Sequence, residues 1–204
     1  ISYDRIADLS AAQGDLSGAQ QANFKSLAIR EALVAKDPQN TELQRDLSIC
    51  HDRIGDVRSA LGDLAGAQVA YMESLKVRAA LVVRDPGNTE WQRDLSASYI
   101  RVGDTHRAQR NFAEAENAYL TALAMREKLV AQGSANAGWR RDLSITYERV
   151  GDLRAAQGDL ASAKKAYQDS LDIRDALAKF EPGNAQWLRD LSIAHTKIGD
   201  INGA

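Results

Sequence analysis

The sequence predicts an all-α solenoid of antiparallel helix pairs, and two observations support this fold class. The first is a four-residue stretch, Arg-Asp-Leu-Ser, which begins at residues 45, 93, 141 and 189, so that neighbouring copies lie 48 residues apart. A fixed period of about 20 to 50 residues is typical of chains that stack one structural repeat on the next. The second is the spacing of apolar residues inside each period, which follows one helix face in two successive segments. We therefore expect the 204 residues to form one repeat array.

The period divides the chain into five repeats, of which the outer two are incomplete. Their boundaries are expected at 1–39, 40–87, 88–135, 136–183 and 184–204. Neither outer repeat resembles a polar capping repeat, which an isolated solenoid normally needs for solubility. We interpret the sequence as a window from a longer array.

The first helix of a repeat is predicted from about Thr41 to Leu61. Asn40 precedes it, and asparagine is a favoured N-cap because its side-chain oxygen accepts a hydrogen bond from the first helical turn. Pro38 ends the preceding helix, since proline cannot continue the hydrogen-bond ladder. The apolar stripe is clearest one repeat later, where it consists of Trp91, Leu95, Tyr99 and Val102. Trp91 and its equivalents Trp139 and Trp187 are expected to fill the core between stacked repeats.

The second helix is predicted to follow the turn Gly62-Asp63, whose aspartate is placed as an N-cap. Its apolar stripe contains Leu64, Ala67, Tyr71, Leu75 and Leu81. Gly55 lies inside the first helix, where a glycine costs about 1 kcal/mol relative to alanine. The piece between Gly55 and Gly62 is too short for a separate helix. We therefore expect one long helix, with Gly55 at a close crossing of two helices.

The bulk composition argues against several classes of function. A formal net charge of −2 does not suit nucleic-acid binding, which usually needs a basic patch. No apolar run approaches the roughly 18 residues of a membrane span, and no signal peptide is recognised, so we expect a cytoplasmic protein. Cys50 is the only cysteine, which excludes an intrachain disulfide and a cysteine pair for zinc.

No group of residues predicts a cofactor, metal or catalytic site. His51 and His195 stand where other repeats have Tyr99 and Tyr147, which favours packing over metal ligation. The glycines are solitary and in phase with the repeat, whereas a phosphate-binding loop clusters them. The aspartates are explained as helix caps or as members of the repeated charge pattern. We therefore expect no catalysis by this chain.

The pattern resembles the tetratricopeptide repeat family over essentially the whole chain. The small residue in the middle of the family's first helix matches Gly55, the small residue early in its second helix matches Ala67, and the aromatic that follows matches Tyr71. Two features depart from the family. Its usual period is 34 residues, so these helices are predicted to be about two turns longer. Where the family often has an aromatic late in the first helix, this chain has Arg58, His106 and Arg154.

The resemblance implies a right-handed superhelix whose first helices line a concave face. It also implies a protein-interaction module without catalysis of its own. On that face, two columns of charged residues form the candidate partner-binding site. The basic column is Arg5, Arg53, Arg101, Arg149 and Lys197, and the acidic column, three residues later in each repeat, is Asp8, Asp56, Asp104, Asp152 and Asp200. Residues at i and i+3 share one helix surface.

Two interpretations of these columns stay open. The charges can hold the backbone or the charged side chains of a bound peptide. Alternatively, they can pair with one another and tie neighbouring repeats together. The second interpretation fits a pattern that is the same in every repeat, so partner specificity is expected from positions that vary. These positions are Asp52, Ile100, Glu148 and Thr196.

The predicted function is a scaffold that binds a protein or peptide segment in its concave groove, as part of a larger protein. The alternative is a structural role, either self-association through the uncapped end helices or use as a rigid spacer. A catalytic domain elsewhere in a longer polypeptide is compatible with both. No cofactor, nucleic acid or membrane partner is expected.

Overall fold

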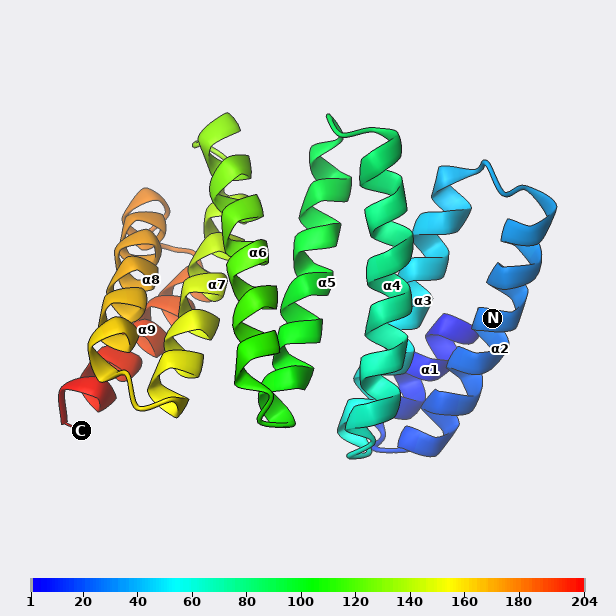
Figure 1. Cartoon of the computed structure of the whole chain (residues 1–204), viewed down its shortest axis with the longest axis horizontal. Helices are drawn as coiled ribbons and strands as arrows, with labels where there is room; N and C mark the ends of the chain where they lie inside the picture. Colours follow the sequence, from blue (N-terminus) through cyan, green and yellow to red (C-terminus); the bar gives the residue numbers. More distant parts are fainter. Residues whose placement is uncertain (1, 204) are drawn as a thin grey trace. The chain divides into compact units, whose positions relative to one another are not determined.

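A computed structural model describes residues 2–203, which form nine α-helices and no strand. Within each of the two bodies named below, consecutive helices pack as antiparallel neighbours (Figure 1). The helices are α1 (Tyr3–Ala12), α2 (Leu16–Lys36), α3 (Thr41–Ala60), α4 (Leu64–Arg84), α5 (Thr89–Ala108), α6 (Phe112–Gln132), α7 (Ala137–Ala156), α8 (Leu160–Phe180) and α9 (Ala185–Gly203). This all-α helical-repeat architecture confirms the predicted fold class. The chain forms two compact bodies: the N-terminal body, residues 1–109, contains α1 to α5, and the C-terminal body, residues 110–204, contains α6 to α9.

The predicted caps set the ends of the helices. The side-chain oxygen of Asn40 accepts hydrogen bonds from the N–H groups of Glu42 and Leu43, each at 3.1 Å. Asp63 caps the second helix of the same repeat by accepting from Gly66 N–H at 2.8 Å. Each cap pairs an N–H group that the helix itself leaves without a partner. The first helix therefore runs from Thr41 to Ala60, within one residue of the prediction.

The turn between the two helices of a pair contains a residue in the left-handed backbone conformation, with a positive φ. Gly14, Gly62 and Gly158 take φ values of 79°, 80° and 84° there. Glycine adopts this conformation without a steric cost, because it has no Cβ. Arg110 occupies the equivalent position between α5 and α6 and adopts a φ of 63°.

The mid-helix glycines lie at close crossings, as predicted. Gly55 on α3 faces the ring of Tyr71 on α4, and a Cβ built at Gly55 would overlap that ring. In the C-terminal body, a Cβ at Gly151 on α7 would lie 2.5 Å from Cε1 of Tyr167 on α8. A tyrosine ring therefore fills the space that the missing side chain leaves.

The core between the paired helices consists mostly of small and aliphatic side chains. Ala67, Ala115 and Ala163 are completely buried near the start of their second helices, and Leu81 and Leu177 are 1% exposed near the ends. These positions repeat every 48 residues, so each helix pair buries the same stripe.

The tryptophans lie nearer the surface than predicted. All three are half-buried. Trp139 covers Gly133, and the ring centroid of Trp187 lies 6.3 Å from that of Phe180. No helix in the described part of the chain combines the length and the apolar character required to cross a bilayer.

The crossing at Gly151 can be tested against the same slot one repeat later. We expect Gly151→Ala to lower the free energy of unfolding by about 1–3 kcal/mol, because the added methyl group overpacks the contact with Tyr167. Gly199 has no side chain or backbone of another helix within 4 Å of the same point. Gly199→Ala should therefore be neutral or stabilise by up to about 1 kcal/mol. Urea unfolding followed by circular dichroism measures both, and equal effects would contradict the close-crossing assignment.

Candidate binding surface

The two charged columns predicted from the sequence meet in the structure as ion pairs between consecutive repeats. Arg53 on α3 binds Asp8 on α1 at 2.6 Å, and Arg101 on α5 binds Asp56 on α3. In the C-terminal body, Lys197 on α9 binds Asp152 on α7 at 2.6 Å. In each of these three pairs the basic residue belongs to the later repeat. These contacts support the interpretation that the columns tie neighbouring repeats together.

The remaining column members lie on the first helices of the two bodies. Arg149 also approaches Asp152, three residues further along α7, at 3.9 Å. Asp104 is half-buried on α5, whereas Arg5 on α1 and Asp200 on α9 are exposed. The columns therefore remain partly open to solvent: the side chains of Asp8 and Arg53 are 62% and 34% exposed.

Tyrosines from the second helices complete this row. The hydroxyl of Tyr71 donates to Asp56 at 2.7 Å, and the hydroxyl of Tyr167 donates to Asp152 at 2.8 Å. Burial of the phenol, together with its hydrogen bond to the Asp56 carboxylate, raises the pKa of Tyr71. Each aspartate thus receives a hydroxyl from its own repeat and a cation from the next.

The positions proposed for partner specificity are mostly inside the fold. Asp52 and Ile100 are 5% and 8% exposed, and the side chain of Glu148 is 14% exposed. Thr196 alone is exposed, and its hydroxyl donates to the Ser192 carbonyl at 3.1 Å. Asp52 and Glu148 face inward because each pairs with an arginine of its own second helix.

Those arginines form a third charged column that the sequence reasoning missed. Its members are Arg30, Arg78, Arg126 and Arg174, one in each second helix at intervals of 48 residues. Arg78, Arg126 and Arg174 are only 3–6% exposed. The sequence contained the evidence for this column, because an arginine that recurs every 48 residues, like the core residues, is expected to have a structural role.

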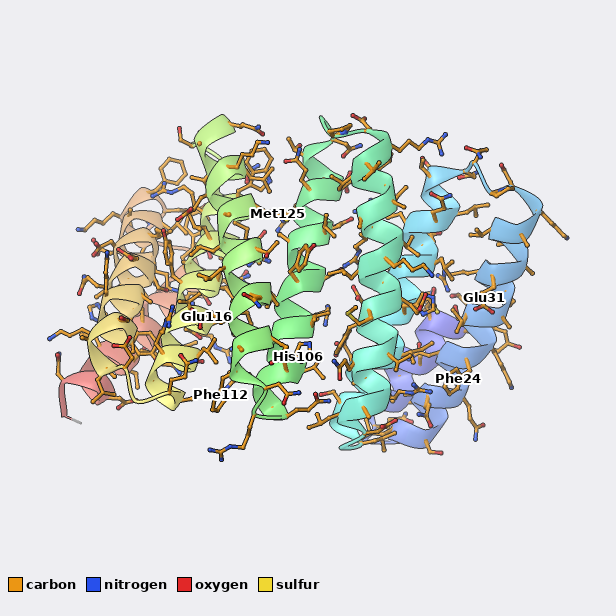
Figure 2. The ribbon with its side chains drawn as sticks, in the orientation of Figure 1. Phe24, Glu31, His106, Phe112, Glu116 and Met125 are labelled. Atoms are coloured by element: carbon orange, nitrogen blue, oxygen red, sulfur yellow. The ribbon has the colours of Figure 1, made fainter. Side chains whose placement is uncertain are left out.

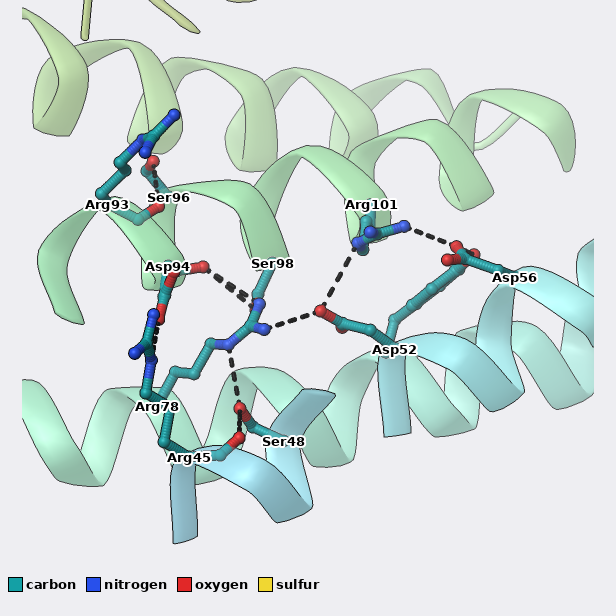
Figure 3. A network of polar contacts seen from close by, with 11 residues as sticks. Arg45, Ser48, Asp52, Asp56, Arg78, Arg93, Asp94, Ser96, Ser98 and Arg101 are labelled. Atoms are coloured by element: carbon teal, nitrogen blue, oxygen red, sulfur yellow. Dashed lines mark hydrogen bonds and ion pairs between the residues drawn. The ribbon is translucent and has the colours of Figure 1, made fainter. Parts of the chain in front are cut away.

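Arg78 joins its own helix pair to the first helix of the next repeat (Figure 3). Its guanidinium binds the Asp52 carboxylate at 2.8 Å and donates from Nε to the Ser48 hydroxyl at 3.1 Å, both on α3. It also donates to the Asp94 carbonyl at 3.1 Å and to the Ser98 hydroxyl at 2.8 Å on α5. Arg174 repeats this arrangement with Glu148, Ser144 and the Asp190 carbonyl at 2.7, 3.3 and 3.0 Å.

The Arg-Asp-Leu-Ser stretch surrounds this buried arginine. Ser48 donates its hydroxyl hydrogen to the Arg45 carbonyl at 2.7 Å, which leaves the oxygen free to accept from Arg78. Arg45 itself binds the carboxylate of Asp94, in the next copy of the stretch, at 2.7 Å. That hydrogen bond raises the pKa of Arg45. Arg141 and Asp190 form the same link at 2.6 Å. The repeated stretch is therefore a junction between repeats.

The slot late in the first helix, where the resemblance predicts an aromatic, contacts the second helix of the preceding repeat. Arg58 lies 5.5 Å from the ring centroid of Phe24, and Nε2 of His106 lies 3.4 Å from the Gln68 amide. Phe24 and His106 are labelled in Figure 2. All three members of this slot are half-buried polar side chains. Within residues 2–203, no group of three or more histidine, cysteine or acidic side chains is arranged to hold a metal ion.

The buried arginine junction makes a specific prediction for stability. Arg174→Met should lower the free energy of unfolding by about 3–5 kcal/mol, because it leaves the Glu148 carboxylate buried without its cation. Adding Glu148→Ile, the residue type found at Ile100 in the preceding repeat, should recover most of that loss. Lys179→Met is the control, because it breaks an exposed pair with Asp175 worth only about 0.5 kcal/mol. Urea midpoints decide the prediction, which is wrong if Arg174→Met costs no more than the control.

Comparisons with known proteins agree with this architecture. Residues 95–134 match a family model described as tetratricopeptide repeat. No curated protein sequence matches the chain. Among solved structures, the chain is similar to BtubC (BKLC) from P. vanneervenii, with a TM-score of 0.69, 19% identity, and coverage of 98% of this chain and 73% of that one.

Two further solved structures show the same fold. The apo form of RapI matches with a TM-score of 0.66 and 10% identity, covering 97% of this chain and 68% of that one. A Podosopora anserina putative kinesin light chain with nearly identical TPR-like repeats matches with a TM-score of 0.61 and 15% identity, covering 98% and 86%. The matched segment 95–134 carries the same pattern as the other repeats. Residues 95–134 thus match a tetratricopeptide repeat, and the solved structures share the helical-repeat fold over nearly the whole chain.

Proposed function

We propose that this chain binds a polypeptide segment along the row of first helices, and that in the N-terminal body the segment lies across α1, α3 and α5. Tetratricopeptide repeats act in general as protein-interaction scaffolds, and the matched family supports that role here. The position of the segment on the first helices is the new part of the proposal.

The observation that carries the proposal is the remaining hydrogen-bonding capacity of the charged columns. The side chains of Asp8, Asp56 and Arg101 are 62%, 49% and 37% exposed although each is ion-paired. A carboxylate offers about four acceptor sites and a guanidinium five donors, so one ion pair leaves several unused. The N–H and C=O groups of an extended peptide can occupy these sites without breaking the pairs.

The pairing of the columns also sets how the surface recognises a partner. Because cation and carboxylate alternate along the row, the surface offers both donors and acceptors and has no strong net charge of its own. Such a surface suits a peptide backbone better than a strongly acidic or basic ligand, which would meet like charges at every second position.

A library of displayed random peptides, selected against the full chain, tests this proposal. We expect enriched peptides to slow hydrogen exchange on α1, α3 and α5. The double variant Arg53→Gln with Asp8→Asn should weaken their binding about tenfold or more, while shifting the free energy of unfolding by at most about 1 kcal/mol, because the pair is half-exposed.

Lys179→Gln with Asp175→Asn is the matched control, since it removes an exposed ion pair from a second helix. It should leave peptide binding unchanged. The proposal is overturned if no peptide is enriched, or if the control weakens binding as much as the first-helix variant. A large loss of stability in the first-helix variant would instead make that ion pair a purely structural link.

A further inference from the structure

The first repeat differs from the others at one facing pair of residues. Asn23 on α2 stands where the later second helices carry Tyr71, Tyr119 and Tyr167. Opposite it, Ala7 on α1 stands where the later first helices carry Gly55, Gly103 and Gly151. The two changes match: Gly55 and Gly151 make room for a tyrosine ring, whereas the first repeat combines a side chain at Ala7 with the shorter Asn23.

In the second and fourth repeats the tyrosine completes a three-part cluster. Tyr71 donates its hydroxyl hydrogen to Asp56, and the guanidinium of Arg101 lies 5.7 Å from the ring centroid. In the C-terminal body, Nζ of Lys197 lies at the same distance from the ring of Tyr167. Each ring therefore lies between a carboxylate and a cation, a position that favours aromatic groups with a hydroxyl donor.

The first repeat keeps the carboxylate and the cation but lacks the ring. Asp8 and Arg53 remain paired at 2.6 Å. Beside them is a cavity of about 460 Å³, the Asn23 cavity, whose apolar wall includes Ala7, Ala11 and Val57. One repeat later, the corresponding hollow beside Tyr71 measures about 190 Å³. The Asn23 cavity is thus the space that a tyrosine occupies elsewhere in the array.

The acceptor for a tyrosine hydroxyl is also present in the first repeat. Tyr71 donates to Asp56, and the residue 48 positions before Asp56 is Asp8. The Asp8 carboxylate lines the Asn23 cavity, and its side chain is 62% exposed although Arg53 binds it. A hydroxyl in the cavity can therefore donate to Asp8 without breaking its ion pair.

We propose that the Asn23 cavity binds the side chain of a tyrosine supplied by a bound polypeptide. The ring lies against the apolar wall beside the guanidinium groups of Arg53 and Arg101, and the hydroxyl donates to the Asp8 carboxylate, as the hydroxyl of Tyr71 donates to Asp56. The source of the tyrosine rests on the proposed function, whereas the cavity's affinity for a phenol does not depend on it.

The wall of the cavity favours a neutral aromatic side chain with a donor. A charged side chain of either sign would meet like charges there, from Asp8, Asp52 and Asp56 or from Arg53, Arg78 and Arg101. Phenylalanine would fill the space but bring no hydroxyl donor to Asp8. Tyrosine combines a ring for the cations with a donor for Asp8, and it is the residue type that the later repeats carry at this position.

The probe is p-cresol, the isolated tyrosine side chain, titrated into the full chain and followed by amide chemical shifts. We expect shifts centred on Ala7, Ala11, Asn23 and Val57. Toluene, which lacks only the hydroxyl, should bind about tenfold more weakly, as expected for the loss of one hydrogen bond to a carboxylate. Equal binding of the two probes, or shifts centred elsewhere, would overturn the proposal.

Two exchanges between repeats serve as matched variants. Ala7→Gly with Asn23→Tyr gives the first repeat its own ring, and it should abolish p-cresol binding and raise the melting temperature. Gly151→Ala with Tyr167→Asn opens the equivalent space in the C-terminal body, and it should create a second p-cresol site beside Asp152 and Lys197. Unchanged p-cresol affinity in the ring-restored variant, with melting confirming that it folds, would refute the assignment.

The same measurements separate this inference from the proposed function. If selected peptides protect α1, α3 and α5 but p-cresol does not bind, only the cavity assignment fails. If p-cresol binds in the Asn23 cavity but no peptide is enriched, the cavity assignment holds and the proposed function fails.

Discussion

A buried guanidinium between consecutive repeats is the constraint on which the rest of this structure depends. A charge taken out of water is costly unless it is paired and its hydrogen-bond donors are satisfied. Arg78 meets that condition only with groups from two repeats. Ser48 and Asp52 belong to its own helix pair. The Asp94 carbonyl and the Ser98 hydroxyl belong to the first helix of the next repeat. A helix pair is therefore complete only when its neighbour is in place. The 48-residue spacing follows from this requirement, because a change in helix length would move the partners away from the arginine.

The junction also explains the character of the first-helix surface. Because Asp52 and Glu148 turn inward to their arginines, the outer part of the row is left to the charged columns and to the tyrosines that contact them. The half-exposed pair of Asp8 and Arg53 thus lies next to the buried ion pair of Arg78 and Asp52. A surface whose polar groups are already oriented loses little conformational entropy when a peptide binds to it. The Asn23 cavity interrupts this surface at the one repeat that lacks its ring.

Periodicity alone was enough to predict the helices, their caps and the close crossings, because each depends on local residue types such as Asn40, Asp63 and Gly55. The burial of Asp52 could not be predicted in this way. The residue type at its position changes from repeat to repeat, and this variation suggested a partner-binding position on the surface. Its burial depends on Arg78, which lies 26 residues further along the chain and which local patterns class as a solvent-exposed helical residue. The Asn23 cavity was missed for a related reason: it becomes visible only when Ala7 and Asn23 are read together as one exchanged pair.

The ion pairs between consecutive first helices run in two opposite directions. At the charged columns the cation belongs to the later repeat, as in Arg53 with Asp8, Arg101 with Asp56 and Lys197 with Asp152. In the Arg-Asp-Leu-Ser stretch the cation belongs to the earlier repeat, as in Arg45 with Asp94 and Arg141 with Asp190. Each face that one repeat presents to the next therefore carries both signs of charge, and head-to-tail stacking is the contact that places every charge opposite its partner.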